Sequence, residues 1–385
     1  MQIAPFELEL WMNKHELKVK FDIAESGIAP LSINELLAYD DDARVTDAIT
    51  NLALGYNDAY GAISLRKEIA KTYSDCVPEN ILITIGAIEA NFLIFHVLLN
   101  RGDHVITQFP AYQQLYSVPE AIGCNVSYWR CHDDKGFKFD LADLRKLIQS
   151  DTKLIIINTP HNPTGAVLSN SEMAEIYDMA KAVGSHVLSD EAYRWLRVPD
   201  STYNFKPAFN LGSSAISTGT MSKPFGLAGL RIGWIAAQSD LIDKCRSTRH
   251  YISLCPGKVD DTLAAIAFRN KDKIFKRNEQ MITENLSMLK EWVDRRADIL
   301  SYHRPAAGLL CMLRHQLDIS SVQLADKLAE QYSVLLAPGS VFGLEGYLRL
   351  GFGQHPDIFQ MGIESADQCF TELIQSGVKT QAVKV

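Results

Sequence analysis

The sequence contains no hydrophobic run that approaches the roughly 18 residues needed to span a bilayer. Residues 1–16 mix acidic and basic side chains among the apolar ones, which is unlike a secretory signal peptide. These absences predict a cytoplasmic protein that does not associate with membranes.

Basic residues are also in short supply. The chain has 38 lysines and arginines against 46 aspartates and glutamates, which gives a net charge of −8. Its densest basic stretch, residues 271–277, is typical of a solvated helix face. A nucleic-acid-binding surface needs clustered basic residues, so we expect no nucleic-acid partner.

Metal-binding patterns are absent from the sequence too. The seven cysteines show neither CxxC nor the Cys/His spacing of a metal site. His104 and His161 are expected to have structural roles. We therefore predict reduced thiols, as in the cytosol, and no metal ion.

What the chain does have is enough apolar residues for a substantial core. It is 385 residues long and 47% hydrophobic, and its length favours two or three domains. Alternating strand and helix patterns over residues 60–270 predict one large α/β domain with a mostly parallel sheet. After a long helix at residues 270–298, the pattern is typical of a smaller α+β domain.

The elements of that smaller domain can be located approximately. Its strands are expected at residues 309–313, 334–337 and 348–352, and its helices at residues 322–331 and 365–375. The predicted division is an N-terminal arm with part of the small domain (1–40), a large domain (41–275) and a small C-terminal domain (276–385).

The most informative stretch is TGTMSKPFGLAGLRIGW, residues 218–234. The amine of a lysine such as Lys223 forms a Schiff base with an aldehyde. The pKa of a lysine falls readily when it is desolvated or placed near another cation, which yields the neutral nucleophile. Thr220 and the forked guanidinium of Arg231 are suited to hold a phosphate of the same cofactor. The alternative for Lys223 alone is a solvated surface charge.

Two further stretches place polar side chains at the ends of strands. Residues 153–158 predict a buried parallel strand, and Asn162 follows it in the loop HNPTG. Residues 186–190 predict a second strand that ends at Asp190, with Tyr193 shortly after it. Ligands of open α/β sheets bind at such strand ends. Asn162 and Tyr193 are suited to hydrogen-bond a phenolate oxygen, and Asp190 to keep a pyridine nitrogen protonated or, alternatively, to cap the next helix.

A fourth stretch, residues 81–99, predicts a strand, the turn Gly86-Ala87-Ile88 and a long apolar helix. The backbone N–H groups at the start of such a helix point toward an anion. Tyr112 follows the next predicted strand, where it can either stack on a flat ring or pack in the core.

These four stretches, in this order and at these separations, resemble the class I/II aminotransferases, which belong to pyridoxal 5′-phosphate (PLP) fold type I. The resemblance extends from about residue 51 to about residue 349. It implies an α/β fold whose large domain has a mostly parallel sheet flanked by helices, joined to a smaller α+β domain. It also implies PLP as the cofactor, and an amino acid and a 2-oxo acid as substrates.

The resemblance implies a role for each matching residue. Lys223 forms the Schiff base with PLP, Asp190 pairs with the pyridine nitrogen, and both are catalytic together with Tyr193. The implied cofactor-binding residues are Gly86, Ala87, Ile88, Tyr112, Asn162, Asp190, Tyr193, Thr220, Lys223, Arg231 and, from a neighbouring subunit, Tyr56. The implied substrate-binding residues are Arg349, which binds the α-carboxylate, Asn162 and Gly27. Because Tyr56 acts across a subunit interface, we expect a homodimer with shared active sites.

Two features depart from the family pattern. Ile88 stands where many relatives have a hydroxyl residue, so phosphate binding would depend more on backbone N–H groups and on Thr220. The segment DIAESGIAPLS, residues 22–32, replaces the usual Gly-x-Pro-like sequence. Since this segment normally lies over the substrate, the identity of the substrate stays open.

The role of Arg349 also has alternatives. Arg349 could form an ion pair at the strand end, or Arg249 or Arg314 could bind the carboxylate instead.

Some short segments have a narrower resemblance. The DIAESG segment, TRHYISLCPG at residues 248–257 and the SKPFGLAGLR phrase are together similar to capreomycidine synthase. That enzyme uses the same scaffold to eliminate and cyclise a hydroxylated arginine. The similarity therefore keeps a second kind of reaction open.

Three functions remain as hypotheses. The first is a PLP-dependent aminotransferase that transfers the amino group of an L-amino acid to a 2-oxo acid by a ping-pong mechanism. The second is a PLP lyase or cyclase of the capreomycidine synthase type, which retains the substrate nitrogen. The third is a non-enzymatic PLP-binding effector domain. The given sequence starts directly at the predicted N-terminal arm, which argues against this third function. The sequence predicts the first function.

Overall fold

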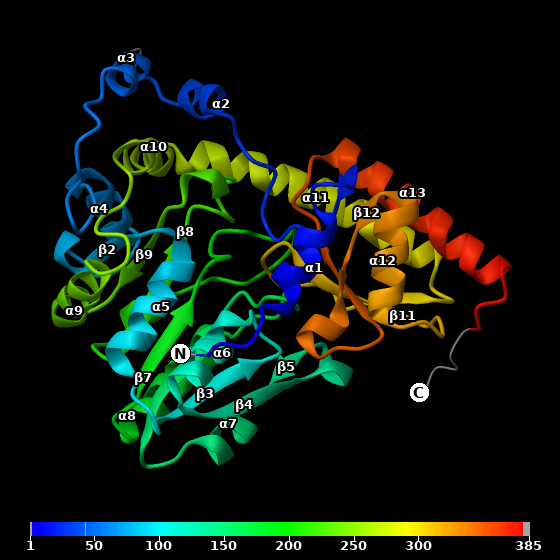
Figure 1. The fold of residues 1–385 in the computed structure, drawn as a ribbon, viewed down its shortest axis with the longest axis horizontal. Coiled ribbons are helices and arrows are strands. Elements are labelled where there is room, and N and C mark those ends of the chain that lie inside the picture. Colours follow the sequence, from blue (N-terminus) through cyan, green and yellow to red (C-terminus); the bar gives the residue numbers. More distant parts are fainter. Residues whose placement is uncertain (1, 43, 380–385) are drawn as a thin grey trace.

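The structure is a computed structural model, and it describes residues 2–42 and 44–379. Its centre is an eight-stranded sheet in which the strands lie in the order β2-β9-β8-β7-β6-β3-β4-β5 (Figure 1). The bounds are β2 Ile81–Thr84, β3 His104–Phe109, β4 Asn125–His132, β5 Lys138–Phe139, β6 Thr152–Asn158, β7 His186–Asp190, β8 Ala215–Thr220 and β9 Gly233–Ala236. The neighbours from β8 through β4 pair in parallel, whereas β2, β9 and β5 pair antiparallel. The predicted, mostly parallel sheet is confirmed.

Helices cover both faces of this sheet because the side chains of a strand alternate between its faces. On one face, Leu154 of β6 packs in a cluster with residues of α5, α6 and α9. On the other face, Ile155 packs with residues of α7 and α8. The helices around the sheet are α4 Ile63–Ala70, α5 Gly86–Leu98, α6 Gln114–Ile122, α7 Leu141–Leu147, α8 Asn170–Ala182, α9 Ser239–Arg249 and α10 Lys258–Arg269. The short helices α2 Ile33–Ala38 and α3 Val45–Thr50 precede them.

The C-terminal part is built around a second, antiparallel sheet with the strand order β10-β11-β14-β13. Its strands are β10 Leu300–Tyr302, β11 Leu310–His315, β13 Ala337–Pro338 and β14 Tyr347–Gly351. The helices are α11 Lys271–Arg295, α12 Ser321–Tyr332 and α13 Pro356–Gln375. In Figure 1 the long helix α11 starts beside α10 above the large sheet and extends into the C-terminal part.

One predicted helix boundary is wrong. We expected the last helix over residues 365–375, but α13 already begins at Pro356. Proline is well suited to the first helical turn, because its missing N–H has no intrahelical partner there in any case.

The N-terminal arm joins the C-terminal part. Strand β1 (Phe21–Asp22) pairs in parallel with β12 (Val334–Leu335). Helix α1 (Glu7–His15) is fixed to α12, because Asp326 accepts hydrogen bonds from Trp11 Nε1 and contacts His15 Nε2, each at 2.9 Å. These contacts attach residues 7–22 to the C-terminal part, and the division at residues 40 and 275 stays a prediction. Residues 1, 43 and 380–385 of its ranges lie outside the described residues.

Over residues 2–42 and 44–379, no helix combines the length and the apolar character that crossing a membrane requires.

Candidate active site

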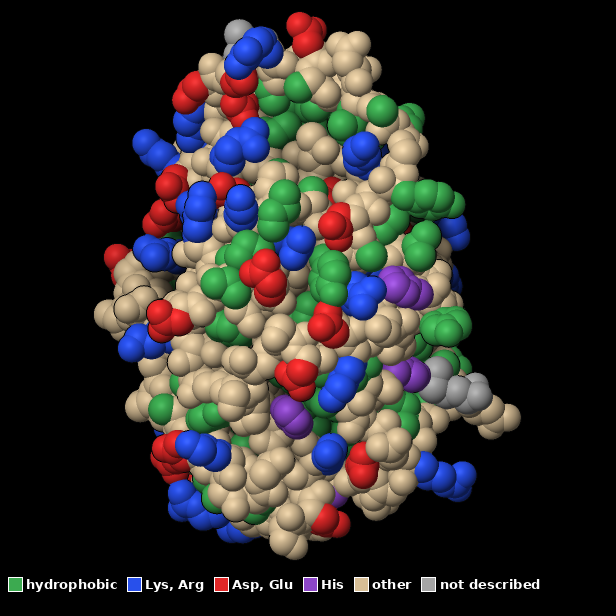
Figure 2. All heavy atoms as spheres, turned by 90° about the vertical axis from the view of Figure 1, so that its left-hand side faces the viewer, with side chains coloured by type: hydrophobic (Ala, Val, Ile, Leu, Met, Phe, Trp, Pro, Cys, Tyr) green, Lys and Arg blue, Asp and Glu red, His purple; other side chains and the backbone are tan. Residues whose placement is uncertain are grey.

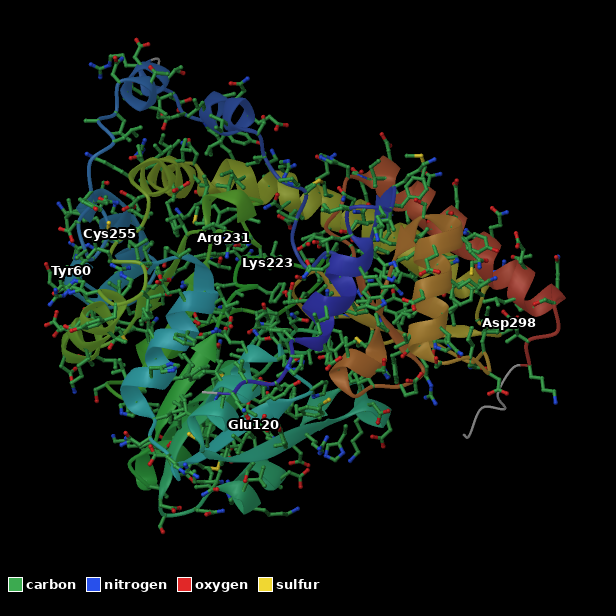
Figure 3. The ribbon with its side chains drawn as sticks, in the orientation of Figure 1. Tyr60, Glu120, Lys223, Arg231, Cys255 and Asp298 are labelled. Atoms are coloured by element: carbon green, nitrogen blue, oxygen red, sulfur yellow. The ribbon has the colours of Figure 1, made fainter. Side chains whose placement is uncertain are left out.

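A cavity of about 300 Å³ lies where β6, β7 and β8 end, and α1 forms its opposite wall. Figure 3 shows Lys223 and Arg231 near the middle of the molecule, between the large sheet and the small domain. The cavity is lined by most of the residues that the sequence singled out, namely Ala87, Ile88, Tyr112, Asn162, Asp190, Tyr193, Thr220, Lys223, Arg231 and Arg349. Residues far apart in the sequence thus meet at the sheet edge where ligands of α/β proteins bind.

Lys223 lies in a loop directly after β8 and points toward the N-terminal segment. Its Nζ donates to Ser26 Oγ at 2.8 Å and to Glu25 Oε1 at 3.2 Å. Burial lowers the pKa of Lys223, but the carboxylate of Glu25 and the phenol of Tyr193 outweigh burial, and the pKa is raised above its ordinary value. The sequence had led us to expect a lowered pKa. That expectation was wrong for this structure, because a carboxylate rather than a cation lies beside the amine.

Asp190 is buried at the end of β7. Its Oδ2 accepts a hydrogen bond from Asn91 Nδ2 at 2.8 Å, and its Oδ1 accepts one from the backbone N–H of Ala192 at 3.0 Å. The second contact is the capping type that we had considered as the alternative. Burial raises the pKa of the Asp190 carboxyl, and its two hydrogen bonds oppose this. A carboxylate held in this way inside a cavity favours a cationic partner in a ligand.

One end of the cavity is built for an anion. Helix α5 begins at Gly86, and Ala87 and Ile88 in its first turn line the cavity. The backbone N–H groups of a first helical turn are suited to bind an anion. Gly86 has φ +72°, and a Cβ at this position would lie 2.8 Å from Nη2 of Arg231. Only glycine leaves the guanidinium its place against the helix start.

Thr220 completes this end of the cavity. Its Oγ1 donates to Ser222 Oγ at 3.0 Å, and Arg231 Nη1 donates to the same Ser222 oxygen at 3.4 Å. Hydroxyl groups, helix N–H groups and a guanidinium therefore converge on one space. Such a donor set fits a phosphate.

Arg349 extends from β14 into the cavity and is only 2% exposed. Its Nη1 donates to Asn162 Oδ1 at 3.3 Å and its Nη2 to the carbonyl of Ala24 at 3.0 Å. Its Nε has no hydrogen-bond partner among the described residues. The two alternative cations, Arg249 and Arg314, do not line this cavity.

Tyr193 and Tyr112 also line the cavity. Tyr193 is buried, and burial raises the pKa of its phenol, so that it stays a proton donor. Tyr112 is half-buried, and its ring centroid lies 5.0 Å from that of Phe6. It thus contacts the core and lines the cavity at once.

Three predicted residues do not line the cavity. Gly86 and Gly27 adjoin it through their backbones, since a Cβ at Gly27 would lie 3.8 Å from Cδ of Lys223. Tyr56 lies elsewhere on the surface and is 87% exposed. A role for Tyr56 within its own subunit's cavity does not fit this position.

Sequence reasoning missed several lining residues. Asn91 lies on α5 a little over one turn after Gly86, and its contact with Asp190 spans 99 residues of sequence. Ser222 stands inside the TMSK phrase and could have been found there. The other polar ones are Glu9, Glu16, Glu25, Ser26, Gln114 and Asn158, and the apolar ones are Leu8, Met12, Ala192 and Ala228. The unusual DIAESG sequence was the signal for Glu25 and Ser26.

This donor set fits PLP. An amine suited to an aldehyde, a buried carboxylate suited to a ring nitrogen and an anion site at a helix start share one cavity. Together with the mostly parallel sheet, they define a PLP-dependent enzyme of fold type I.

Comparison with known proteins places the chain more narrowly. The family model for aminotransferase class I and II matches residues 30–359, and the chain belongs to this family of PLP-dependent enzymes. It is 29% identical to capreomycidine synthase from Streptomyces vinaceus over 90% of this chain and 88% of that protein. A PLP-dependent aminotransferase from Streptococcus suis has a TM-score of 0.92 and 34% identity over 97% of this chain and 99% of the other. The PLP-dependent cyclase OrfR has a TM-score of 0.88 and 27% identity over 97% and 98%.

Proposed function

We propose that this enzyme transfers the amino group of an L-amino acid to a 2-oxo acid. The observation that carries the proposal is the meeting of Lys223, Asp190 and Arg349 in one cavity. These three side chains supply an amine, a buried carboxylate and a buried guanidinium, each suited to a different part of the cofactor or the substrate. Membership in the aminotransferase family supports the same reaction.

Each side chain has a distinct proposed task. Arg349 binds the substrate α-carboxylate with its forked guanidinium and so orients the α-hydrogen. Lys223 Nζ removes the proton from the α-carbon. Asp190 holds the ring nitrogen of PLP in its protonated form. When bound, PLP supplies the electron sink for this chemistry.

The remaining residues would hold the cofactor. The start of α5 with Gly86, Thr220 and Arg231 would bind its phosphate. Asn162 and Tyr193 would hydrogen-bond its ring oxygen, and Tyr112 would stack on its ring. Because the first product leaves before the second substrate binds, we expect ping-pong kinetics.

A second candidate is a lyase or cyclase reaction in which the substrate keeps its nitrogen. It is favoured by the similarity to capreomycidine synthase and to a PLP-dependent cyclase. Both candidates use the same residues up to the loss of the α-proton, which Lys223 removes in either case. They differ in the fate of the amino group.

The fate of the amino group also tests the proposal. The purified, PLP-loaded enzyme would be incubated with a panel of ¹⁵N-labelled amino acids, each with 2-oxoglutarate or pyruvate. We expect ¹⁵N in the newly formed glutamate or alanine. Retention of ¹⁵N in a product that has lost a β-substituent would support the cyclase candidate instead, and no turnover of any kind would contradict both.

Arg349→Lys is expected to lower kcat/KM by ten- to a hundredfold, about 1.4–3 kcal/mol, because lysine keeps the charge but loses the two parallel hydrogen bonds. PLP affinity should stay unchanged, since the phosphate site lies elsewhere in the cavity. Steady-state kinetics and cofactor titration measure both quantities. Arg314→Lys, an exposed arginine on the neighbouring strand β11, is the matched control. Equal kcat/KM for wild type and Arg349→Lys would remove Arg349 from the substrate site.

The active enzyme is proposed to be a homodimer with shared active sites. Leu54, Tyr56 and Tyr251 are each exposed over at least 80% of their surface. The segments that carry them, between α3 and α4 and between α9 and α10, lie at the left of Figure 1. Figure 2 shows hydrophobic side chains reaching this face between charged ones. Large exposed apolar side chains in one region favour burial against another chain, and two-fold dimers are the commonest homo-oligomers.

Tyr56→Phe is expected to weaken PLP binding about ten- to a hundredfold, because a hydroxyl that donates to a phosphate contributes roughly 1.5–3 kcal/mol. Since Tyr56 does not line its own subunit's cavity, the loss should act in the neighbouring site. Mixing Tyr56→Phe subunits with inactive Lys223→Ala subunits should then create one complete site per mixed dimer. Activity at limiting PLP would rise above that of either variant alone.

The control for this experiment pairs Arg349→Lys with Lys223→Ala. Both residues line the same cavity of one chain, so mixed dimers of these two variants contain no complete site. If the Tyr56→Phe mixture showed no more recovery than this control, the assignment of Tyr56 to the partner's site would be wrong.

A cytoplasmic location belongs to the same proposal. All seven cysteines are free thiols in the structure. Unpaired cysteines in this number are typical of a reducing compartment.

A further inference from the structure

Asn91 is a buried amide in a mostly apolar helix. It lies on α5, whose buried residues include Leu93, Ile94 and Phe95, and its side chain is fully buried. A buried amide destabilises a fold unless its donors and acceptors are hydrogen-bonded. The partners of Asn91 therefore explain how the helix tolerates it, and they lie at the candidate active site or directly beside it.

The alternation of side chains along a strand brings Asp190 and Thr218 to the face of the sheet that α5 covers. The two residues are register partners on the parallel strands β7 and β8. Two positions earlier on these strands, Leu188 and Ile216 pack in the cluster that contains the apolar side chains of α5. Because side chains two positions apart on a strand lie on the same face, Asp190 and Thr218 also face α5. In Figure 1, α5 lies over this part of the sheet.

The amide of Asn91 is hydrogen-bonded to both of these side chains. Its Nδ2 donates to Asp190 Oδ2 at 2.8 Å, and its Oδ1 accepts from Thr218 Oγ1 at 3.0 Å. Gln114 Oε1 is a second acceptor for Nδ2 at 3.5 Å, and Gln114 is itself oriented because its Nε2 donates to the carbonyl of Ile88. With a donor at Oδ1 and two acceptors at Nδ2, one orientation of the amide satisfies its neighbours. In this orientation the NH2 group faces Asp190.

The carboxyl group of Asp190 has few other donors. Among the described residues, Asn91 has the only side chain that donates to it, and the other donor is the backbone N–H of Ala192 in the following turn. Burial raises the pKa of the Asp190 carboxyl, and the bond from Asn91 is the stronger of the two that oppose this rise. A hydrogen bond donated to a carboxylate favours its charged form. Loss of the Asn91 donor would therefore favour a protonated Asp190.

We propose that Asn91 is a positioning residue of the reaction, held by Thr218 and Gln114 so that its amide keeps Asp190 deprotonated and oriented. This inference rests on the proposed function, in which Asp190 keeps the ring nitrogen of PLP protonated. Asn91 acts through Asp190 alone. Without its N–H donor, the proton on the ring nitrogen would move to the Asp190 carboxylate, and the neutral ring would be a weaker electron sink.

Asn91→Leu tests this role, because leucine has a similar volume but donates no hydrogen bond. The variant would be loaded with PLP that carries ¹⁵N in its ring, and the ¹⁵N chemical shift would report whether the ring nitrogen is protonated. A hydrogen bond to a charged group changes an equilibrium by about tenfold or more, so we expect the signal to move toward that of an unprotonated ring. At saturating PLP, kcat should fall by about tenfold or more for the same reason, with KM for the amino acid nearly unchanged.

Thr218→Val is a second variant, which decides the question if Asn91→Leu does not fold. Valine keeps nearly the shape of threonine but removes the hydroxyl that orients the Asn91 amide, so we expect a smaller shift in the same direction. Asn285→Leu is the matched control. Asn285 is also fully buried on a helix, its Nδ2 donates to the carbonyls of Phe352 and Gln354, and it does not line the cavity. This variant should lower Tm without moving the ring signal.

Asp190→Asn, measured in the same way, separates this inference from the proposed function. A ring signal that moves in Asp190→Asn but stays at the wild-type position in Asn91→Leu and Thr218→Val would overturn the role of Asn91. The proposed role of Asp190 would then remain in place. A ring signal that stays at the wild-type position in Asp190→Asn as well would overturn the role of Asp190 in the proposed function.

Discussion

Lys223→Ala is expected to lower kcat by about 10⁴-fold, the upper range for a group that moves a proton in the rate-limiting step. Among the described residues, Lys223 is the only side chain in the cavity wall with an amine that can join an aldehyde, so PLP should bind to the variant without a covalent link. The phosphate donors around Arg231 remain in this variant. We therefore expect PLP to be retained in part, with the absorbance of a free aldehyde rather than that of a lysine adduct.

The matched control is Lys276→Ala, which removes an exposed lysine on α11 that does not line the cavity. Its kcat and absorbance should equal those of the wild type. An external amine such as methylamine should restore part of the activity to Lys223→Ala by supplying the missing base. A Lys223→Ala enzyme with wild-type kcat would contradict the role of this residue in proton transfer.

Asp190→Asn is expected to lower kcat by about 10²–10³-fold, or about 2.7–4 kcal/mol. Asparagine keeps the shape and can still accept from Asn91, but it removes the charge that keeps a ring nitrogen protonated. Removing one partner of a buried, hydrogen-bonded charge pair costs several kcal/mol, because the other partner stays in a medium of low dielectric. Steady-state kinetics under saturating PLP measure the loss.

Asp178→Asn provides the control, since Asp178 is exposed on α8, the helix that precedes β7. It should not change kcat. If Asp190→Asn kept full activity, Asp190 would be only the cap of the turn at Ala192, which its second hydrogen bond would explain by itself.

The sequence was sufficient where local pattern determines structure. The apolar run at residues 153–158 gave the position of β6, and Asp190 ends β7 as expected. Because β6, β7 and β8 are parallel neighbours, their C-terminal ends lie at one edge of the sheet. Asn162, Asp190 and Thr220, at or just after these ends, therefore lie close together. This is why one cavity could be predicted from stretches spread over the chain.

The sequence was insufficient where a contact joins distant segments without a pattern. Glu25 and Lys223 are separated by 198 residues, and neither periodicity nor turn chemistry links them. Their contact depends on how the N-terminal segment packs against β14, which is a tertiary property. The direction of the Lys223 pKa shift was missed for the same reason, because that shift depends on which charge lies nearest the amine.

Peptide mass spectrometry after borohydride reduction would identify the residue that carries the cofactor, which we propose is Lys223. Reduction of the PLP-loaded wild-type enzyme would fix the cofactor to the amine it is bound to, and proteolysis would then separate the lysine peptides. We expect a phosphopyridoxyl group on the peptide that contains Lys223 and on no other peptide. A modification found on another lysine, or on none, would contradict it.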